Sequence, residues 1–208
     1  MLRQHSLPDY PFTHSGTLIV VGSSPCVHQD LKDALKLGRN AAYAGVNEGA
    51  GVVPVEMIMS MHGEHMERFC ALRNRLKGGP FTTHAVMGNK VSMQDFDKYP
   101  VDFWWDAFSG ASSAAAAIMI GKHMGFDEII LCGCPLSGGD GYYLETYGST
   151  PEMARVGFST DQSGLIQSYQ KTFANYAKTP TFVNVFSMSG FTKSVLGPPP
   201  HHRKRAHG

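Results

Sequence analysis

The chain is poor in several features that would place it in a special class of protein. Its 208 residues include only four cysteines, which are too few and too scattered for a disulfide framework. This usage is typical of a reducing compartment, so we expect a cytoplasmic protein. The formal net charge of +1 gives no basis for bulk electrostatic attraction to nucleic acid or to a membrane surface.

Long apolar runs and the common nucleotide-binding motifs are also missing. No apolar run approaches the roughly 20 residues that span a bilayer, and the N-terminal segment lacks the apolar core of a signal peptide. Neither the dinucleotide-binding spacing G-x-G-x-x-G nor the phosphate loop G-x-x-x-x-G-K occurs. H-E-x-x-H and C-x-x-C are absent too, so we expect no metal site.

The clearest local pattern that is present lies at residues 109–136. A turn of small residues at 109–113 precedes an alanine-rich run that predicts a helix over 114–124. Gly125 is a typical helix stop, and EIILC at 128–132 predicts a strand buried on both faces. A helix followed by such a strand is half of a nucleotide-binding α/β unit, in which ligands lie at helix N-termini and strand C-termini.

Further strands and helices alternate along the chain. Apolar runs ended by glycine or polar residues predict strands, and amphipathic runs predict helices. We expect strands at 17–21, 43–46, 55–61, 81–86 and 181–186, and helices at 29–37, from the residues after His65 to Leu76, and at 161–178.

This alternation favours an α/β fold of the Rossmann-like, doubly wound type. Such a fold has a mainly parallel sheet with helices on both faces. We expect a single domain over residues 17–196. A loosely held arm at 1–16 would precede it, and a disordered basic tail at 197–208 would follow it.

Two loops after predicted strands carry groups that suit a nucleotide. In the loop Gly22-Ser23-Ser24-Pro25, small residues let a ligand approach the backbone and hydroxyls suit a phosphate or a sugar. An ordinary turn capped by serine is an equally good interpretation. Asn47 ends the second strand, and its amide can donate and accept as a base or ribose requires. A simple turn residue is the alternative.

Two histidines, His62 and His65, follow the third predicted strand. An H-x-x-H spacing on a helix places both rings on one face. A general base or a phosphate contact is expected here because ligands gather at the carboxyl ends of parallel strands. The alternative is a pair of solvated histidines at the start of a helix.

Aromatic residues mark two further segments. The stretch 102–106 contains both tryptophans, which would stack on a base or, more commonly, pack in the core. The glycine-rich loop at 138–145 contains Tyr142, Tyr143 and Glu145. It is suited to close over a site as a lid, and a variable surface loop is the alternative.

The order of these loops resembles the superfamily that joins bacterial lipooligosaccharide sialyltransferases and pterin-diphosphokinase-like Rossmann proteins, with phage and prophage relatives. In that family an apolar strand precedes G-x-G-P-S-L, and an asparagine follows the second strand. A Ser-Gly turn and a small-residue helix then precede the pattern lGy-x-x-I-x-L-x-G-x-D. The matching residues here are Gly22, Pro25, Asn47, Ser109, Gly110, Gly125, Phe126, Ile129, Leu131 and Gly133.

The resemblance implies a cleft for CMP or another nucleotide at the carboxyl edge of the sheet. The lining residues would be Gly22, Ser23, Ser24, Pro25, Asn47, Ser109, Gly110, Ser112, Gly133, Tyr142 and Tyr143. Sialyltransferases of this type use a histidine from the C-terminal half as the base, whereas this chain has none between His123 and His201. His62 is therefore the favoured base, with His65, Asp106 and Glu145 as alternatives.

Three functions are compatible with these residues. The first is a glycosyltransferase with a nucleotide-sugar donor, either CMP- or UDP-linked. The second is a diphosphokinase that needs Mg²⁺ and ATP, although Cys134-Pro135 stands where the family has an aspartate. The third is a non-catalytic nucleotide-binding phage accessory protein. In each case the partner is a small nucleotide or nucleotide sugar, the acceptor is open, and a homo-oligomer is compatible with the sequence.

Overall fold

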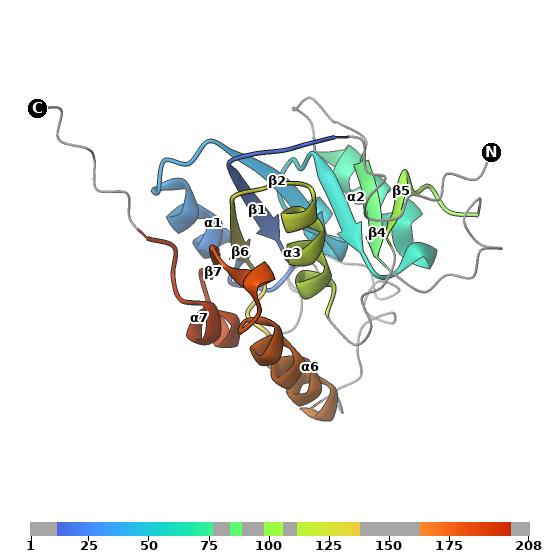
Figure 1. The fold of residues 1–208 in the computed structure, drawn as a ribbon. Helices are drawn as coiled ribbons and strands as arrows, with labels where there is room; N and C mark the ends of the chain where they lie inside the picture. Colours follow the sequence, from blue (N-terminus) through green and yellow to red (C-terminus); the bar gives the residue numbers. More distant parts are fainter. Residues whose placement is uncertain (1–11, 77–83, 89–97, 106–111, 138–162, 201–208) are drawn as a thin grey trace, which may run out of the picture.

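A seven-stranded sheet forms the centre of the computed structural model, which describes residues 12–76, 84–88, 98–105, 112–137 and 163–200. The strand order is β5-β4-β3-β2-β1-β6-β7, and every adjacent pair is parallel. The strands are β1 (Thr17–Val21), β2 (Ala41–Val46), β3 (Met57–Ser60), β4 (His84–Gly88), β5 (Phe103–Trp105), β6 (Glu128–Cys132) and β7 (Val185–Ser187). The order reverses between β1 and β6 (Figure 1), which confirms the doubly wound α/β fold.

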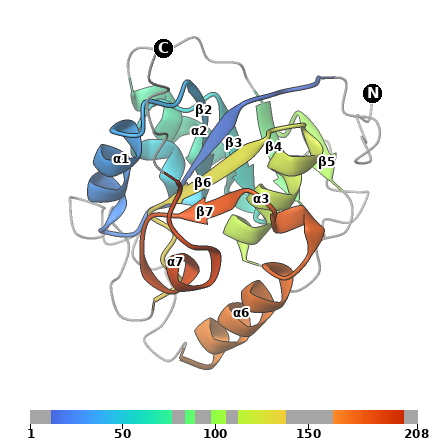
Figure 2. The ribbon, with the colours of Figure 1, turned by 60° about the vertical axis from the view of Figure 1, so that its left-hand side comes forward.

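Helices cover both faces of this sheet. They are α1 (Val27–Leu35), α2 (Met66–Arg75), α3 (Ser113–His123), α6 (Ser163–Tyr176) and α7 (Gly190–Leu196), with short 3-10 turns η2 (Asn47–Gly51), η3 (Gly63–His65) and η5 (Pro180–Phe182). Figures 1 and 2 show α3 and α6 on one side and α1 and α2 on the other, and the core clusters divide in the same way. Within the described ranges, none of the helices has the length and apolar content that a bilayer crossing requires.

The central strands are continuous apolar runs because both of their faces are buried. In β1, Leu18 and Val20 pack in the cluster under α3, whereas Ile19 and Val21 pack in the cluster under α1. All four side chains are at most 2% exposed. The alternation explains why this strand and β6 could be predicted from the sequence with the observed bounds.

Helix α3 approaches the sheet closely because its buried face consists of small residues. Ala114 to Ala117 are buried, and a Cβ at Gly121 would lie 2.7 Å from Leu18 Cδ2. The helix begins at a serine cap, in which Ser112 Oγ accepts the Ala115 N–H at 3.3 Å. The cap fixes where the first turn of α3 meets the end of the sheet.

Three segments differ from their predicted secondary structure. Residues 103–105 form the edge strand β5, and their buried side chains confirm the core role of these aromatics. The strand predicted at 181–186 is present, but its predicted start is wrong, because residues 180–182 form a 3-10 turn and Asn184 has φ 57°. The strand therefore begins only at Val185, and α7 follows it where no helix was predicted.

The N-terminal arm contacts the domain over its last residues. The backbone N–H of His14 donates to Met124 O at 2.8 Å. The backbone N–H of Gly16 donates to Asp127 Oδ2 at 2.7 Å. The loose arm expected from the sequence therefore does not include residues 12–16, and residues 1–11 lie outside the described part of the chain.

The start of the predicted tail is likewise bound to the domain. Arg39, whose side chain is 4% exposed, forms a two-pronged ion pair with Glu128 at 2.8 and 3.2 Å. The same guanidinium donates to Pro200 O at 2.8 Å. The expected disorder therefore does not apply to residues 197–200, and it stays a prediction for residues 201–208, which are not described.

Candidate functional site

Those predicted polar residues that the structure describes lie at the carboxyl edge of the sheet. Strands β1 and β6 are paired up to Val21 and Cys132, so the loops that follow them begin side by side. Strands β2 and β3 are paired up to Val46 and Met59 on the other side of β1. Ligands of doubly wound proteins bind at this edge, beside the point where the strand order reverses.

The loops after β1 and β6 pack directly on each other. The Gly22 N–H donates to Cys132 O at 2.8 Å, and the Ser24 N–H donates to Gly133 O at 3.2 Å. A Cβ on Gly22 would lie only 2.2 Å from Gly133 O. Glycine at position 22 is therefore required by the close approach of two backbones.

A buried carboxylate holds this pair of loops in place. Asp30 on α1 is 5% exposed. Its Oδ2 accepts the Gly133 N–H at 2.8 Å and the Ser189 hydroxyl at 2.6 Å. The Cys26 Sγ lies 3.3 Å from the same Ser189 Oγ. Asp30 thus joins the loop after β6 to the segment between β7 and α7, and sequence reasoning missed it because both partners are distant in the chain.

Replacement of Asp30 by alanine is expected to lower the free energy of unfolding by about 2–3 kcal/mol, because it leaves the buried Gly133 N–H and the half-buried Ser189 hydroxyl without this acceptor. Urea denaturation measures the change. The matched control is Asp33→Ala on the same helix, where the carboxylate is exposed to solvent and hydrogen-bonds to Gln29 and Lys36. Equal effects of the two substitutions would contradict the role of Asp30.

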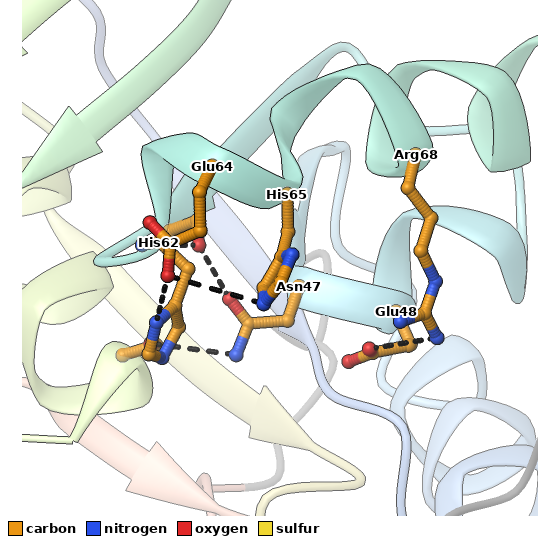
Figure 3. A network of polar contacts seen from close by, with 8 residues as sticks. Asn47, Glu48, His62, Glu64, His65 and Arg68 are labelled. Atoms are coloured by element: carbon orange, nitrogen blue, oxygen red, sulfur yellow. Dashed lines mark hydrogen bonds and ion pairs between the residues drawn. The ribbon is translucent and has the colours of Figure 1, made fainter. Parts of the chain in front are cut away.

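A second polar cluster joins the ends of β2 and β3 to the N-terminus of α3 (Figure 3). Ser60 Oγ donates to Asn47 Oδ1 at 2.6 Å and accepts the His62 N–H at 2.9 Å. Asn47 Nδ2 donates to Ser113 Oγ at 3.4 Å. Asn47 has φ 52°, so it is a turn residue, and its amide also organises this edge.

The two histidines lie beside a shared glutamate. His62 Nδ1 is 3.3 Å from Glu64 Oε1, and His65 Nε2 is 3.9 Å from the same oxygen. The two ring centroids are 6.0 Å apart. The side chains of His62 and His65 are 43% and 33% exposed. Both imidazoles are therefore accessible from solvent at the carboxyl edge.

The turn η2 connects the second cluster to the end of β1. A Cβ on Gly49 would lie 2.0 Å from Val21 O, so η2 packs directly on β1. Glu48 forms an ion pair with Arg68 of α2 at 3.1 Å, and both side chains are largely buried (Figure 3). These contacts fix Asn47 between β1 and α2.

The predicted site residues fall into three groups. Gly22, Ser23 and Gly133 are buried in the loop pair, with Ser24 half-buried and Pro25 exposed. Asn47, His62, His65 and Ser112 lie in or beside the second cluster, together with Ser60, Glu64 and Ser113, which sequence reasoning missed. Ser109, Gly110, Tyr142, Tyr143, Glu145 and Asp106 lie outside the described residues.

All four cysteines are free thiols. Cys132 belongs to the cluster under α1 and Cys134 to the cluster under α3, because β6 ends at Cys132 and the chain turns at Gly133, which has φ 68°. Burial raises the pKa of the Cys134 thiol to about 12, and burial also raises the pKa of Cys132. Burial raises the pKa of Cys26 and Cys70 as well, although both are partly exposed.

The rate of alkylation should differ between the two partly exposed cysteines and the two buried ones. At pH 8, iodoacetamide is expected to modify Cys26 and Cys70 slowly in the native protein, because each raised pKa leaves little thiolate. Raising the pH toward 9 should accelerate both reactions. Cys132 and Cys134 should react only after unfolding, and intact-mass spectrometry counts the adducts. Native labelling of either buried thiol would contradict the packing of the loop pair.

The fold and this edge define a doubly wound α/β protein with hydroxyl, amide and imidazole groups gathered at the strand ends. Compared with known proteins, the chain matches no family model, no curated protein and no solved structure. Among the residues that the structure describes, no group of three His, Cys, Asp or Glu side chains is arranged to hold a metal ion. The chemistry of the carboxyl edge must therefore be inferred from the hydrogen-bond donors and acceptors that line it.

Proposed function

We propose that the protein binds a nucleotide at the carboxyl edge of its sheet and acts as a transferase with a CMP- or UDP-linked sugar donor. The observation that supports this best is the cluster of Asn47, Ser60, His62 and Ser113. It brings the Asn47 amide to the first turn of α3 and holds the His62 backbone at Ser60, beside that amide. Amides suit a base or ribose, and helix N-termini favour phosphate.

The donor phosphate would lie at the N-terminus of α3. The backbone N–H groups of a first helical turn point out of the helix, and the helix dipole favours negative charge there. Ser113 Oγ lies on this turn, within 3.4 Å of Asn47 Nδ2. These groups would stabilise the negative charge that the departing nucleotide gains as the bond between sugar and phosphate breaks.

His62 would supply the general base. Its ring lies at the end of β3, and Nδ1 faces Glu64 at 3.3 Å, which leaves Nε2 to take a proton. In the transfer step the acceptor oxygen bonds to the anomeric carbon of the sugar. The acceptor proton moves to His62, and the nucleotide leaves with the electron pair of the broken bond.

Titration calorimetry with CMP, UDP, GDP, ATP and NAD tests the proposal. We expect binding of a cytidine or uridine nucleotide, and about tenfold weaker binding in Ser113→Ala and in Asn47→Ala, since each loses one hydrogen bond. Ser168→Ala, an exposed serine on α6, is the matched control and should bind normally. Binding of none of these ligands would overturn the proposal.

The two alternative functions, a non-catalytic nucleotide-binding protein and a diphosphokinase, predict different results in the same assays. A non-catalytic protein would bind the nucleotide without turning over any donor. A diphosphokinase would consume ATP and stop when EDTA removes Mg²⁺. Of the described carboxylates near this edge, Asp30 is buried among its donors, Glu48 is paired with Arg68, and Glu64 lies beside His62 and His65. No observation therefore favours a magnesium site over the sugar transferase.

A further inference from the structure

We propose that Glu64 is a positioning residue that sets the tautomer of His62. The contact that carries this inference is the 3.3 Å distance between Glu64 Oε1 and His62 Nδ1 (Figure 3). The inference rests on the proposed function in one respect, which is that His62 acts as the base. The tautomer itself can be measured without any substrate.

The carboxylate decides which ring nitrogen carries the proton. An ionised carboxylate has acceptors only, so an imidazole nitrogen that hydrogen-bonds to it must be the N–H. In neutral His62 the proton is therefore on Nδ1, and Nε2 holds a lone pair. A lone pair on Nε2 is what a general base needs, and the nearby negative charge stabilises the imidazolium that forms.

His62 is a better partner for Glu64 than His65 is. The same carboxylate oxygen is 3.9 Å from His65 Nε2, which is beyond hydrogen-bonding distance. The His65 ring instead packs edge-on against Phe69, with centroids 6.2 Å apart. The His62 backbone is also fixed, because its N–H donates to Ser60 Oγ at 2.9 Å. Backbone and ring of His62 are thus both held at the edge.

The chemistry that this arrangement serves is deprotonation of a neutral hydroxyl. An alcohol that attacks a sugar carbon must lose its proton as the new bond forms, and a correctly oriented imidazole accelerates that step. The substrate class that Glu64 implies is therefore a hydroxyl acceptor. An acceptor that is already an anion, such as a carboxylate or a phosphate, would need no base and no orienting glutamate.

The test uses the full chain labelled with ¹⁵N and long-range ¹H–¹⁵N spectra of the histidine rings, recorded at a pH where they are neutral. In the wild type we expect His62 to be protonated on Nδ1. Glu64→Ala should shift His62 toward the Nε2–H form, whereas Glu64→Gln should keep Nδ1–H because the amide oxygen still accepts. Glu67→Ala, an exposed glutamate in the first turn of α2, is the control.

Two results would overturn the inference. One is a His62 tautomer that Glu64→Ala leaves unchanged, and the other is a change of equal size in Glu67→Ala. Once a donor is identified, Glu64→Ala should lower kcat on the order of tenfold with little change in KM, which is less than loss of the base itself. If no donor is turned over, the proposed function fails, while the tautomer measurement still decides the role of Glu64.

Discussion

Replacement of Gly22 by alanine is expected to lower the free energy of unfolding by about 3 kcal/mol or more. The added methyl group would lie 2.2 Å from Gly133 O and 2.6 Å from Cys134 Sγ. Neither contact can relax cheaply, because the Gly133 N–H is bonded to the buried Asp30 carboxylate. The loops after β1 and β6 would have to separate, and the hydrogen bond between Gly22 N–H and Cys132 O would weaken.

Chemical denaturation followed by circular dichroism measures this effect. The control is Gly38→Ala, because Gly38 has φ 66° and a Cβ there would meet nothing within 4 Å. That substitution introduces only backbone strain, which costs about 1–2 kcal/mol. A loss at Gly22 no larger than the loss at Gly38 would show that the two loops are not in the contact described.

Replacement of His62 by alanine is expected to lower kcat by about 10²–10⁴ on a donor and acceptor that the wild type turns over. The expected cause is loss of the proton acceptor, so KM should change much less than kcat. Steady-state kinetics with the nucleotide sugar found by calorimetry measures both constants. The side chain is 43% exposed, so the substitution should leave the fold stable.

His123→Ala is the matched control for this prediction. His123 ends α3, at the opposite end of that helix from Ser113, and it is exposed. Its replacement should leave kcat unchanged. Turnover retained in His62→Ala would contradict the assignment of the base, and the base would then have to be sought at His65 or in segments outside the described residues.

The sequence predicts a strand well where its residue pattern is compatible with only one type of secondary structure. β1 and β6 are five-residue apolar runs between polar or glycine boundaries, and their observed bounds are those predicted. β5 has only three residues, and its aromatics are also typical of stacking sites. The last strand was predicted too early because the apolar pattern at 181–186 does not reveal the 3-10 turn or the positive φ of Asn184.

For the candidate site, too, local sequence predicts some features, whereas others depend on contacts between residues that are distant in the chain. Asn47 and His62 could be predicted as candidates because Asn47 directly follows β2 and His62 comes two residues after β3, and these positions alone place them at the carboxyl edge. Their arrangement could not be predicted. Ser60 contacts Asn47 across 13 residues, and Asp30 contacts Gly133 across 103. Such pairings depend on strand order and register, which no local pattern in the chain encodes.

The central claim is that a nucleotide binds at the carboxyl edge beside the N-terminus of α3. Amide chemical-shift mapping of the full ¹⁵N-labelled chain with CMP or UDP tests it most directly. The account predicts shifts concentrated at residues 22–25, 47–48, 60–65 and 112–114, with none at Arg39 and Glu128 on the amino edge. Shifts centred on Arg39 and Glu128, or no shifts with either nucleotide, would contradict it.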